Sequence, residues 1–135
     1  KPLDSILYGE TIEQSKIIEF KTIQNEDQLN SEITKTVNSD KLLIVKFYAD
    51  WCISCNKLER VVFSNKAVNE VLKDTLTSTL DVTDNNRFNQ SMLARFSLVG
   101  PPALLFFKNG LEQRSYRIIG EISAEELVEH LNNLR

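Results

Sequence analysis

The chain has 135 residues, of which 41% are hydrophobic and 26% charged, with a formal net charge of −3. This length suits a single domain that buries about two thirds of its unfolded surface, and the composition argues against wholesale disorder. The acidic balance gives no electrostatic reason to expect nucleic acid or an anionic membrane as partner, and no apolar run approaches the ~20 residues of a membrane span.

The N-terminal part of the chain carries no signal-peptide pattern and begins with Lys rather than Met. We therefore expect an excised piece of a longer protein, whose membrane anchor, if there is one, lies outside this sequence. Residues 1–15 show no sustained periodicity and predict a linker or a loosely docked arm, which leaves residues 16–135 as the folded domain.

The next elements are a short strand, a helix and a buried strand. Apolar residues within 17–23 indicate the first strand, and Asn25 with Gln28 resembles a capping box that opens an amphipathic helix. Residues 42–49 are nearly continuously apolar, which predicts a central strand covered on both faces, although Lys46 interrupts it. The apolar face of the helix is expected to comprise Leu29, Ile33 and Val37.

Three further helical segments and one strand follow this central strand. One helix opens at the cysteines, a second follows residues 63–65, a strand covers 76–82 and a third helix begins near Asp84. The periodic apolar residues of these helices are expected to be buried. They are Leu58, Val61, Val62, Ala67, Val68, Val71, Leu72, Phe88, Met92, Leu93 and Phe96.

The C-terminal part predicts a hairpin and a closing helix. A Gly-Pro-Pro break at 100–102 precedes an apolar strand at 103–107, Asn-Gly at 109–110 signals a hairpin, and 115–119 form the return strand. A capping box at 123–126 opens the last helix. The order of elements predicts an α/β fold with a mixed central sheet flanked by helices on both faces, preceded by an N-terminal extension.

Cys52 and Cys55 are the only cysteines of the chain. Their spacing places both sulfurs within bonding reach on the first turn of a helix, as a dithiol or a disulfide. A structural crosslink over so short a loop would contribute only about 2 kcal/mol, and zinc needs about four ligands, whereas His130 is the only histidine. Both alternatives stay open, but the pattern favours redox chemistry.

The position of the pair suggests a role for each sulfur. A thiol at a helix N-terminus is stabilised as thiolate by unpaired N–H groups and the helix dipole. We therefore expect Cys52 to be the exposed nucleophile and Cys55 the sheltered resolving thiol. Cys52 would attack a partner's disulfide, and Cys55 would then attack Cys52 and release the reduced partner.

A family resemblance covers residues 17–135. Trp51-Cys52-x-x-Cys55 after a buried strand, the Gly-Pro-Pro break and Lys108-Asn109-Gly110 before a closing helix resemble the thioredoxin superfamily. Within it, the chain is similar to the C-terminal periplasmic domains of the DsbD family of membrane thiol:disulfide interchange proteins. The matching residues are Tyr48 to Cys52, Glu59, Phe63-Ser64, Asp81-Val82-Thr83, Leu104, Phe106 and Phe107, with Phe20, Ile23 and Leu29-Asn30 upstream.

The resemblance implies a disulfide reductase domain in the periplasm of a Gram-negative bacterium. Such a domain receives reducing equivalents from a membrane-embedded domain and passes them to an N-terminal periplasmic domain of the same protein, in support of disulfide isomerisation and cytochrome c maturation. It implies a soluble, monomeric part of an inner-membrane protein that needs no cofactor beyond its disulfide and no metal. The alternatives are a free-standing periplasmic thioredoxin and a redox-inert binding module of the same fold.

The resemblance also assigns further residues to the site. Pro102 matches a cis-proline beside the sulfurs, whose preceding backbone would bind a partner strand, and Trp51 would form a surface platform next to Cys52. Helical spacing, rather than the resemblance alone, points to Glu59: it lies seven residues after Cys52 on the same helical face, so we expect a partly buried carboxylate that accepts the proton of Cys55 and raises nearby thiol pKa values. The structural alternatives are a trans turn, a half-buried core tryptophan and a solvated glutamate.

Lys46 departs from the family pattern, which usually has a buried aspartate six residues before the first cysteine. A buried lysine is costly unless it is paired, and Glu59 is the nearest candidate partner. A positive charge here would stabilise a thiolate, so we expect a lower pKa for Cys52 than in relatives with aspartate. If Lys46 instead reaches solvent, this effect would vanish. His130 is expected to be solvent-exposed and without a role.

Overall fold

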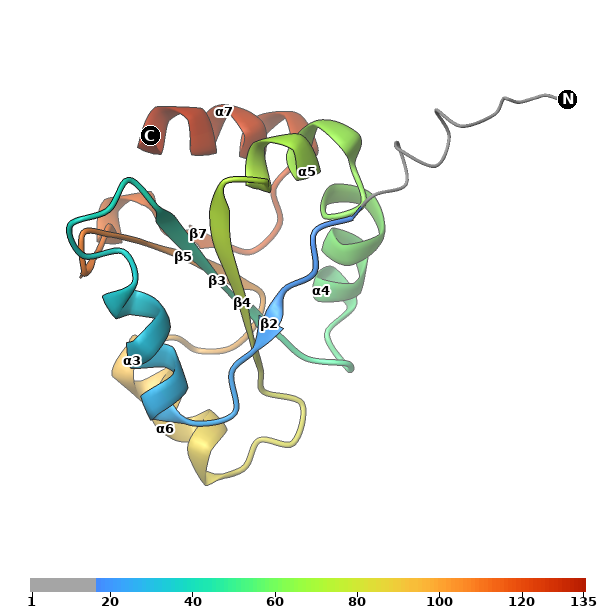
Figure 1. Ribbon diagram of the computed structural model, residues 1–135. Helices are drawn as coiled ribbons and strands as arrows, with labels where there is room; N and C mark the ends of the chain where they lie inside the picture. Colours follow the sequence, from blue (N-terminus) through green and yellow to red (C-terminus); the bar gives the residue numbers. More distant parts are fainter. Residues whose placement is uncertain (1–16) are drawn as a thin grey trace, which may run out of the picture.

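The computed structural model describes residues 17–135; the linker or arm expected at 1–15 lies outside the described residues (Figure 1). The described strands form one mixed sheet in the order β2-β4-β3-β5-β6, with β7 paired to β5. β2, β4 and β3 are parallel, and β5 runs antiparallel to β3, β6 and β7. The strands are β2 Lys21–Thr22, β3 Leu42–Tyr48, β4 Thr75–Asp81, β5 Ala103–Lys108, β6 Leu111–Glu112 and β7 Ile118–Ile119.

Helices cover both faces of this sheet, as the sequence predicted. In Figure 1, α3 and α6 lie on one side, and α4, α5 and α7 lie on the other. The helices are α3 Glu26–Thr34, α4 Ile53–Lys57, the π-helical turn η1 Leu58–Val62, α5 Lys66–Leu72, α6 Arg87–Arg95, the 3-10 turn η2 Arg114–Tyr116 and α7 Ala124–Leu134.

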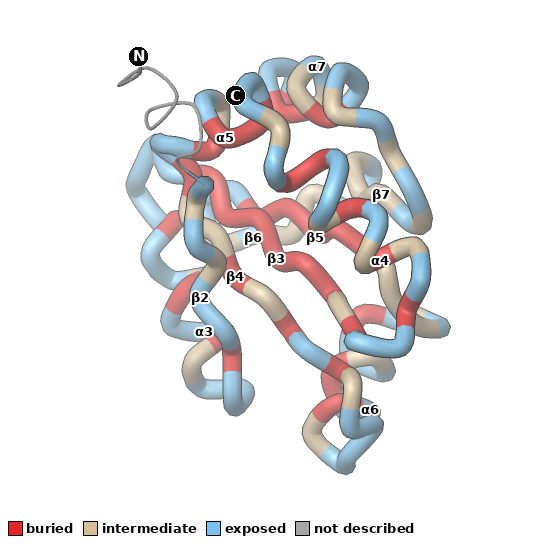
Figure 2. Tube along the Cα trace, turned by 90° about the vertical axis from the view of Figure 1, so that its right-hand side faces the viewer, coloured by how far each residue is buried: buried red, intermediate tan, exposed pale blue. Residues whose placement is uncertain are grey.

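The central strand β3 divides the apolar core in two. Successive side chains of a strand point to opposite faces, so Leu43, Val45 and Phe47 pack with α3 and α6, whereas Leu42 and Ile44 pack with α5 and α7. Figure 2 shows β3 as an almost unbroken buried segment. The prediction of a strand covered on both faces is confirmed. By the same alternation, Lys46 lies on the face of Leu42 and Ile44.

The first strand is shorter than predicted. β2 comprises only Lys21 and Thr22, followed by an Ile23 N–H that donates to the carbonyl of Thr79, and the Ile18 N–H before it donates to Asn69 Oδ1 of α5 over 2.7 Å. The capping of α3 also differs in detail. Asn25 Oδ1 accepts from the Gln28 N–H as predicted, but Gln28 Oε1 accepts from the N–H of Gln24 rather than of Asn25.

Three predicted core positions are wrong. Val37 lies beyond the end of α3 and is exposed, since the helix stops at Thr34. Val61 is exposed, because the helix after Lys57 continues as a π-helical turn; Leu58 and Val62 are buried as predicted, and Phe63 is buried as well. Ala67 is also exposed, on the outer side of α5.

The predicted return strand at 115–119 is also wrong in its extent. Asn109 and Gly110 both have positive φ values, 51° and 78°, as a tight two-residue hairpin turn requires. The return strand β6 therefore begins at once, at Leu111. The chain then leaves the sheet through η2 and rejoins β5 only as the two-residue strand β7.

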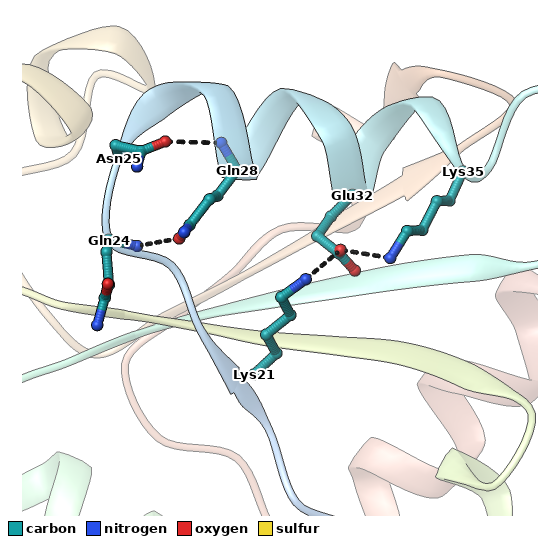
Figure 3. A network of polar contacts seen from close by, with 6 residues as sticks. All are labelled: Lys21, Gln24, Asn25, Gln28, Glu32 and Lys35. Atoms are coloured by element: carbon teal, nitrogen blue, oxygen red, sulfur yellow. Dashed lines mark hydrogen bonds and ion pairs between the residues drawn. The ribbon is translucent and has the colours of Figure 1, made fainter.

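Helix α3 buries a carboxylate between two lysines (Figure 3). Glu32 is only 3% exposed and accepts hydrogen bonds from Lys21 Nζ at 3.1 Å and Lys35 Nζ at 2.7 Å. Burial raises the pKa of this carboxyl, but the ammonium groups of Lys35 and Lys21 more than offset that effect and hold the pKa below its usual 4.5. The ionised form is therefore the one that stabilises the fold.

Replacing Glu32 by glutamine should lower the free energy of unfolding by about 1–2 kcal/mol at pH 7, because charge-assisted hydrogen bonds are lost from a buried group. Glu32 contributes stability above its unfolded-state pKa and loses it as the pH falls through the lower folded-state value. Urea unfolding at pH 7 and along an acid series should thus show a shallower acid loss in the variant.

The matched control for this prediction is Glu70→Gln. Glu70 pairs with Lys73 at the same helical spacing as Glu32 and Lys35, at 3.0 Å, but both partners are exposed. Exposed pairs contribute little, so Glu70→Gln should leave the unfolding curve nearly unchanged. An equal loss of unfolding free energy in the two variants would show that the burial of Glu32 does not strengthen its ion pairs.

Candidate active site

The two cysteines lie where β3 passes into α4. Cys52 is the N-cap residue of α4 and forms a disulfide with Cys55, with 5.2 Å between the Cα atoms. The Cys55 N–H donates to Cys52 Sγ over 3.1 Å, so the helix aims a backbone donor at this sulfur.

The exposure of the two cysteines differs from what the sequence predicted. Cys52 is 7% exposed and Cys55 is 2% exposed, so the prediction of an exposed Cys52 is wrong for the disulfide form. The Cys52 side chain belongs to the apolar cluster that also contains Ala49 and Phe96. Cys52 nevertheless remains the more accessible of the two.

The Pro101–Pro102 peptide is cis, as the family resemblance implied. The carbonyl of Pro102 accepts from the N–H of Gly120 over 3.1 Å, which ties this loop to the end of β7. Trp51 is 61% exposed and therefore a surface residue rather than part of the core. Val99 in the proline loop and Ile53 between the cysteines are also exposed apolar side chains.

Glu121 connects the loop after β7 to α4. Its carboxylate accepts from the hydroxyl of Ser54 at 2.8 Å and forms an ion pair with Lys57 at 3.3 Å. The Ser54 hydroxyl and the Lys57 ammonium hold the pKa of this carboxyl below its usual value. Sequence reasoning missed Glu121, since it lies 67 residues from Ser54 and no local pattern marks it.

Lys46 is buried and paired with Glu59. It is 6% exposed, and its Nζ lies 2.6 Å from Glu59 Oε2, so the predicted pairing is confirmed and a solvent-reaching lysine is wrong. The ammonium also lies 3.9 Å and 4.5 Å from the ring centroids of Phe20 and Phe63. Burial lowers the pKa of Lys46, and the Glu59 carboxylate offsets part of that change.

The ion pair has contact with solvent on the Glu59 side. The Glu59 side chain is 39% exposed, which agrees with the expectation of a partly buried carboxylate. A cavity of about 330 Å³ adjoins the pair, so water can reach this face of the sheet. It is lined by Ile17, Ile18, Phe20, Lys46, Glu59, Phe63 and Thr79.

A second polar cluster supports the start of α4. The hydroxyl of Tyr48 lies 3.0 Å from Asp50 Oδ1 and 3.2 Å from Asn56 Oδ1, and Asn56 Nδ2 donates to the carbonyl of Asp50. Burial raises the pKa of Tyr48, and its hydrogen bond to Asp50 raises it further. Sequence reasoning missed Asn56, whose role is visible only once the strand end and the helix are side by side.

Three other observations concern residues 17–135. No cluster of three or more His, Cys, Asp or Glu side chains is arranged there to hold a metal ion. None of the helices in this range combines the length and the apolar character that crossing a membrane demands. His130 is half-buried, because it packs on Phe106 and its Nε2 lies 2.7 Å from the carbonyl of Tyr116. Its predicted exposure is wrong.

Comparison with known sequences gives consistent matches. The family model described as Thioredoxin matches residues 20–133. Thiol:disulfide interchange protein DsbD of Pseudomonas sp. (strain JR1 / K1) is 35% identical over 117 residues, which cover 86% of this chain and 20% of that protein. DsbD of Photorhabdus laumondii is 34% identical over 137 residues, 99% of this chain and 24% of that protein. The chain thus spans about a fifth of the length of these relatives.

Comparison with solved structures gives the same architecture. The oxidised C-terminal domain of Neisseria meningitidis DsbD superposes with a TM-score of 0.70 at 24% identity, over 87% of this chain and all of that domain. The thioredoxin of Fasciola hepatica gives a TM-score of 0.68 at 21% identity, over 86% of this chain and all of that protein. At these identities the likeness concerns the arrangement of the backbone.

Proposed function

The chain belongs to the thioredoxin family and has the thioredoxin fold, and from that premise we propose that it is a thiol:disulfide oxidoreductase domain acting as a reductase. The observation that carries this proposal is the Cys52–Cys55 disulfide at the N-terminus of α4, with the Cys55 N–H directed at Cys52 Sγ. A donor in this position stabilises a thiolate, which is the attacking species in disulfide exchange.

The proposed reaction has two steps. In the reduced domain, the Cys52 thiolate attacks one sulfur of a partner's disulfide, forming a mixed disulfide and releasing the partner's other sulfur as a thiolate. Cys55 then loses its proton and attacks Cys52, which restores the Cys52–Cys55 disulfide and frees the partner as a dithiol. The pair itself carries the two electrons, so no further cofactor and no metal is needed.

Trp51 and Pro102 complete the proposed site. The exposed Trp51 would be the platform against which a partner docks beside Cys52, in line with the enrichment of tryptophan at binding surfaces. The loop that ends at Pro102 would pair with an extended segment of the partner. The hydrogen bond from the Gly120 N–H to the Pro102 carbonyl supports this assignment, because it holds the loop next to Glu121, which binds Ser54 between the two cysteines.

We further propose that this domain is one station in an electron relay. The match covers only 20% and 24% of the two relatives named thiol:disulfide interchange protein DsbD, which supports a role as one domain of a larger protein. In that role it would be a monomeric periplasmic domain that takes reducing equivalents from a membrane-embedded domain. It would pass them to an N-terminal periplasmic domain for disulfide isomerisation and cytochrome c maturation.

The Lys46–Glu59 pair is proposed to set the proton affinity of the cysteines. The Lys46 ammonium would favour thiolates, whereas the Glu59 carboxylate would disfavour them; the 39% exposure of the Glu59 side chain supports a role in taking up the proton of Cys55. Because the two charges offset one another, the pair should depress the thiol pKa values less than an unpaired lysine would.

Replacing Lys46 by aspartate should therefore raise the pKa of Cys52 in the reduced domain. The substitution removes a positive charge and places a second carboxylate opposite Glu59, and both changes disfavour a nearby thiolate. The measurement is thiolate absorbance against pH for the wild type and the variant. Coincident titration curves would exclude Lys46 from the control of thiol reactivity.

The function itself is tested by the reduction potential of the Cys52–Cys55 couple, measured by equilibration with dithiothreitol or glutathione couples and titration of free thiol. A value near that of thioredoxin, roughly −270 mV, supports a reductase, whereas one near roughly −120 mV would reverse the direction of electron flow. Cysteines that do not respond to dithiothreitol, together with no reduction of insulin, would favour a redox-inert binding module instead.

A further inference from the structure

The turn that follows β4 lies beside the segment that leads to Cys52. β4 ends at Asp81, opposite Tyr48 of β3, and the Val82 N–H donates to the carbonyl of Tyr48 over 2.7 Å. The two strands therefore end together, and the chain segments that leave them run side by side. The residue after Val82 is Thr83, to which the redox chemistry proposed above assigns no part.

Thr83 binds both residues that precede Cys52. The N–H of Asp50 donates to Thr83 Oγ1 over 2.8 Å, and the indole Nε1–H of Trp51 donates to the carbonyl of Thr83 over 3.0 Å. Thr83 thus binds the backbone N–H of Asp50 and the indole of Trp51, the next residue. Trp51 is largely exposed, and this hydrogen bond is the one that its side chain makes within the described part of the chain.

The carboxylate of Asp81 orients the N–H and the hydroxyl of Thr83. The carboxylate of Asp81 accepts from the N–H of Thr83 at 2.9 Å and also from its hydroxyl. The hydroxyl proton is therefore directed to Asp81, and an oxygen lone pair remains to accept from the Asp50 N–H. The hydroxyl of a serine could make the same two contacts, whereas a valine side chain, which has nearly the same shape, could make neither.

We propose that Thr83 is a positioning residue for disulfide exchange, which holds the Asp50–Trp51 segment so that Cys52 and the ring of Trp51 face an incoming disulfide together. Cys52 belongs to the same turn, since its N–H donates to the carbonyl of Ala49 over 3.1 Å. A shift of this turn would misalign the attacking sulfur, and small misalignments are costly in rate. The inference rests on the proposed function.

The test compares Thr83→Val with Thr83→Ser in the full chain. The second-order rate constant of the reduced protein with the small disulfide 5,5′-dithiobis(2-nitrobenzoic acid) and with insulin should fall about threefold to tenfold in Thr83→Val. It should stay near the wild-type value in Thr83→Ser. The reduction potential should stay unchanged, because the turn affects the approach of the two sulfurs rather than the stability of the disulfide.

Tryptophan fluorescence provides a second readout. Trp51 is the only tryptophan of the chain, so its anisotropy and its quenching by iodide report on the mobility and exposure of this one side chain. Thr83→Val keeps the carbonyl that binds the indole but removes the hydroxyl contacts that hold this turn, so it should lower the anisotropy and increase the quenching. The matched control is Thr77→Val on β4, which removes a threonine hydroxyl whose only hydrogen bond in the described part of the chain is to the carbonyl of Glu19, and should change neither quantity.

Three results would overturn the proposal. They are a wild-type exchange rate in Thr83→Val, an unchanged Trp51 anisotropy in that variant, and equal slowing in the valine and serine variants. If Thr83→Val does not fold, Asp81→Ala is tested in its place. That substitution removes the acceptor that orients the Thr83 hydroxyl, so it should also slow disulfide exchange, and an unaltered exchange rate would overturn the proposal. A wild-type protein that exchanges no disulfides would instead refute the proposed function.

Discussion

Replacing Cys52 by serine should abolish disulfide exchange, with a loss of activity to the background of the assay. Serine is among the most favourable N-cap residues, and the Cys55 N–H that now donates to Cys52 Sγ can donate to a serine oxygen instead. The variant should therefore fold like the reduced wild type, so that its inactivity reports on chemistry. Insulin reduction with dithiothreitol as electron source measures the loss.

Replacing Cys55 by serine should give a different result. Cys52 can still attack, but no second thiol lies in position to resolve the mixed disulfide, so the adduct with a partner should accumulate. Non-reducing electrophoresis or intact-mass spectrometry detects this adduct. Because Cys55 is only 2% exposed, the new hydroxyl should also lower the stability by about 1 kcal/mol, which a thermal melt of both variants would show.

The matched control for both cysteine variants is Ser54→Ala. It lies between the two cysteines and removes only the hydrogen bond to Glu121, so it should retain exchange and form no lasting adduct. An adduct formed through Cys55 in Cys52→Ser, with none through Cys52 in Cys55→Ser, would interchange the roles assigned to the two sulfurs.

The two halves of the Lys46–Glu59 pair should respond oppositely to removal. Glu59→Gln leaves the ammonium of Lys46 buried without its countercharge, which should cost about 1–3 kcal/mol; the partial exposure of Glu59 keeps this below the cost for a fully buried pair. Lys46→Met replaces the buried charge by an apolar chain of similar length and leaves Glu59 next to water. It should be neutral or stabilising.

The pH dependence of stability distinguishes this account from a simple packing effect. The folded-state pKa of Lys46 is lowered, mainly by burial, so between that value and the usual 10.5 the unfolded chain binds more protons. The free energy of unfolding should therefore rise with pH across that window in the wild type and lose this rise in Lys46→Met. Denaturant unfolding from neutral pH up to the usual lysine pKa measures both slopes.

Two outcomes would contradict this account of the pair. One is a stability loss in Lys46→Met as large as in Glu59→Gln, which would mean that the ion pair contributes more than its desolvation costs. The other is an unchanged pH profile of disulfide exchange in Glu59→Gln, which would remove the carboxylate from the proton transfer of Cys55. The exposed pair Glu70–Lys73 again provides the control, through Glu70→Gln.

Local sequence patterns were enough to predict much of this architecture. The apolar run at 42–49 predicted the central strand, the cap at Ser123 predicted the last helix, and Asn109-Gly110 predicted the hairpin. These signals are reliable because they arise from neighbouring residues: strand alternation, an N-cap oxygen, or a backbone with positive φ. The spacing of Cys52 and Cys55 is local in the same way, so the sequence alone predicted that the two sulfurs could bond.

Tertiary structure alone decided which distant residues complete the site. Thr83 reaches the Asp50–Trp51 segment only because β3 and β4 end at the same edge of the sheet, and Glu121 reaches Ser54 only because the loop after β7 passes α4. The burial of Cys52 likewise depends on several elements that pack around it. Sequence reports the short-range preferences of a chain, whereas contacts between distant segments follow from how its apolar faces are buried together.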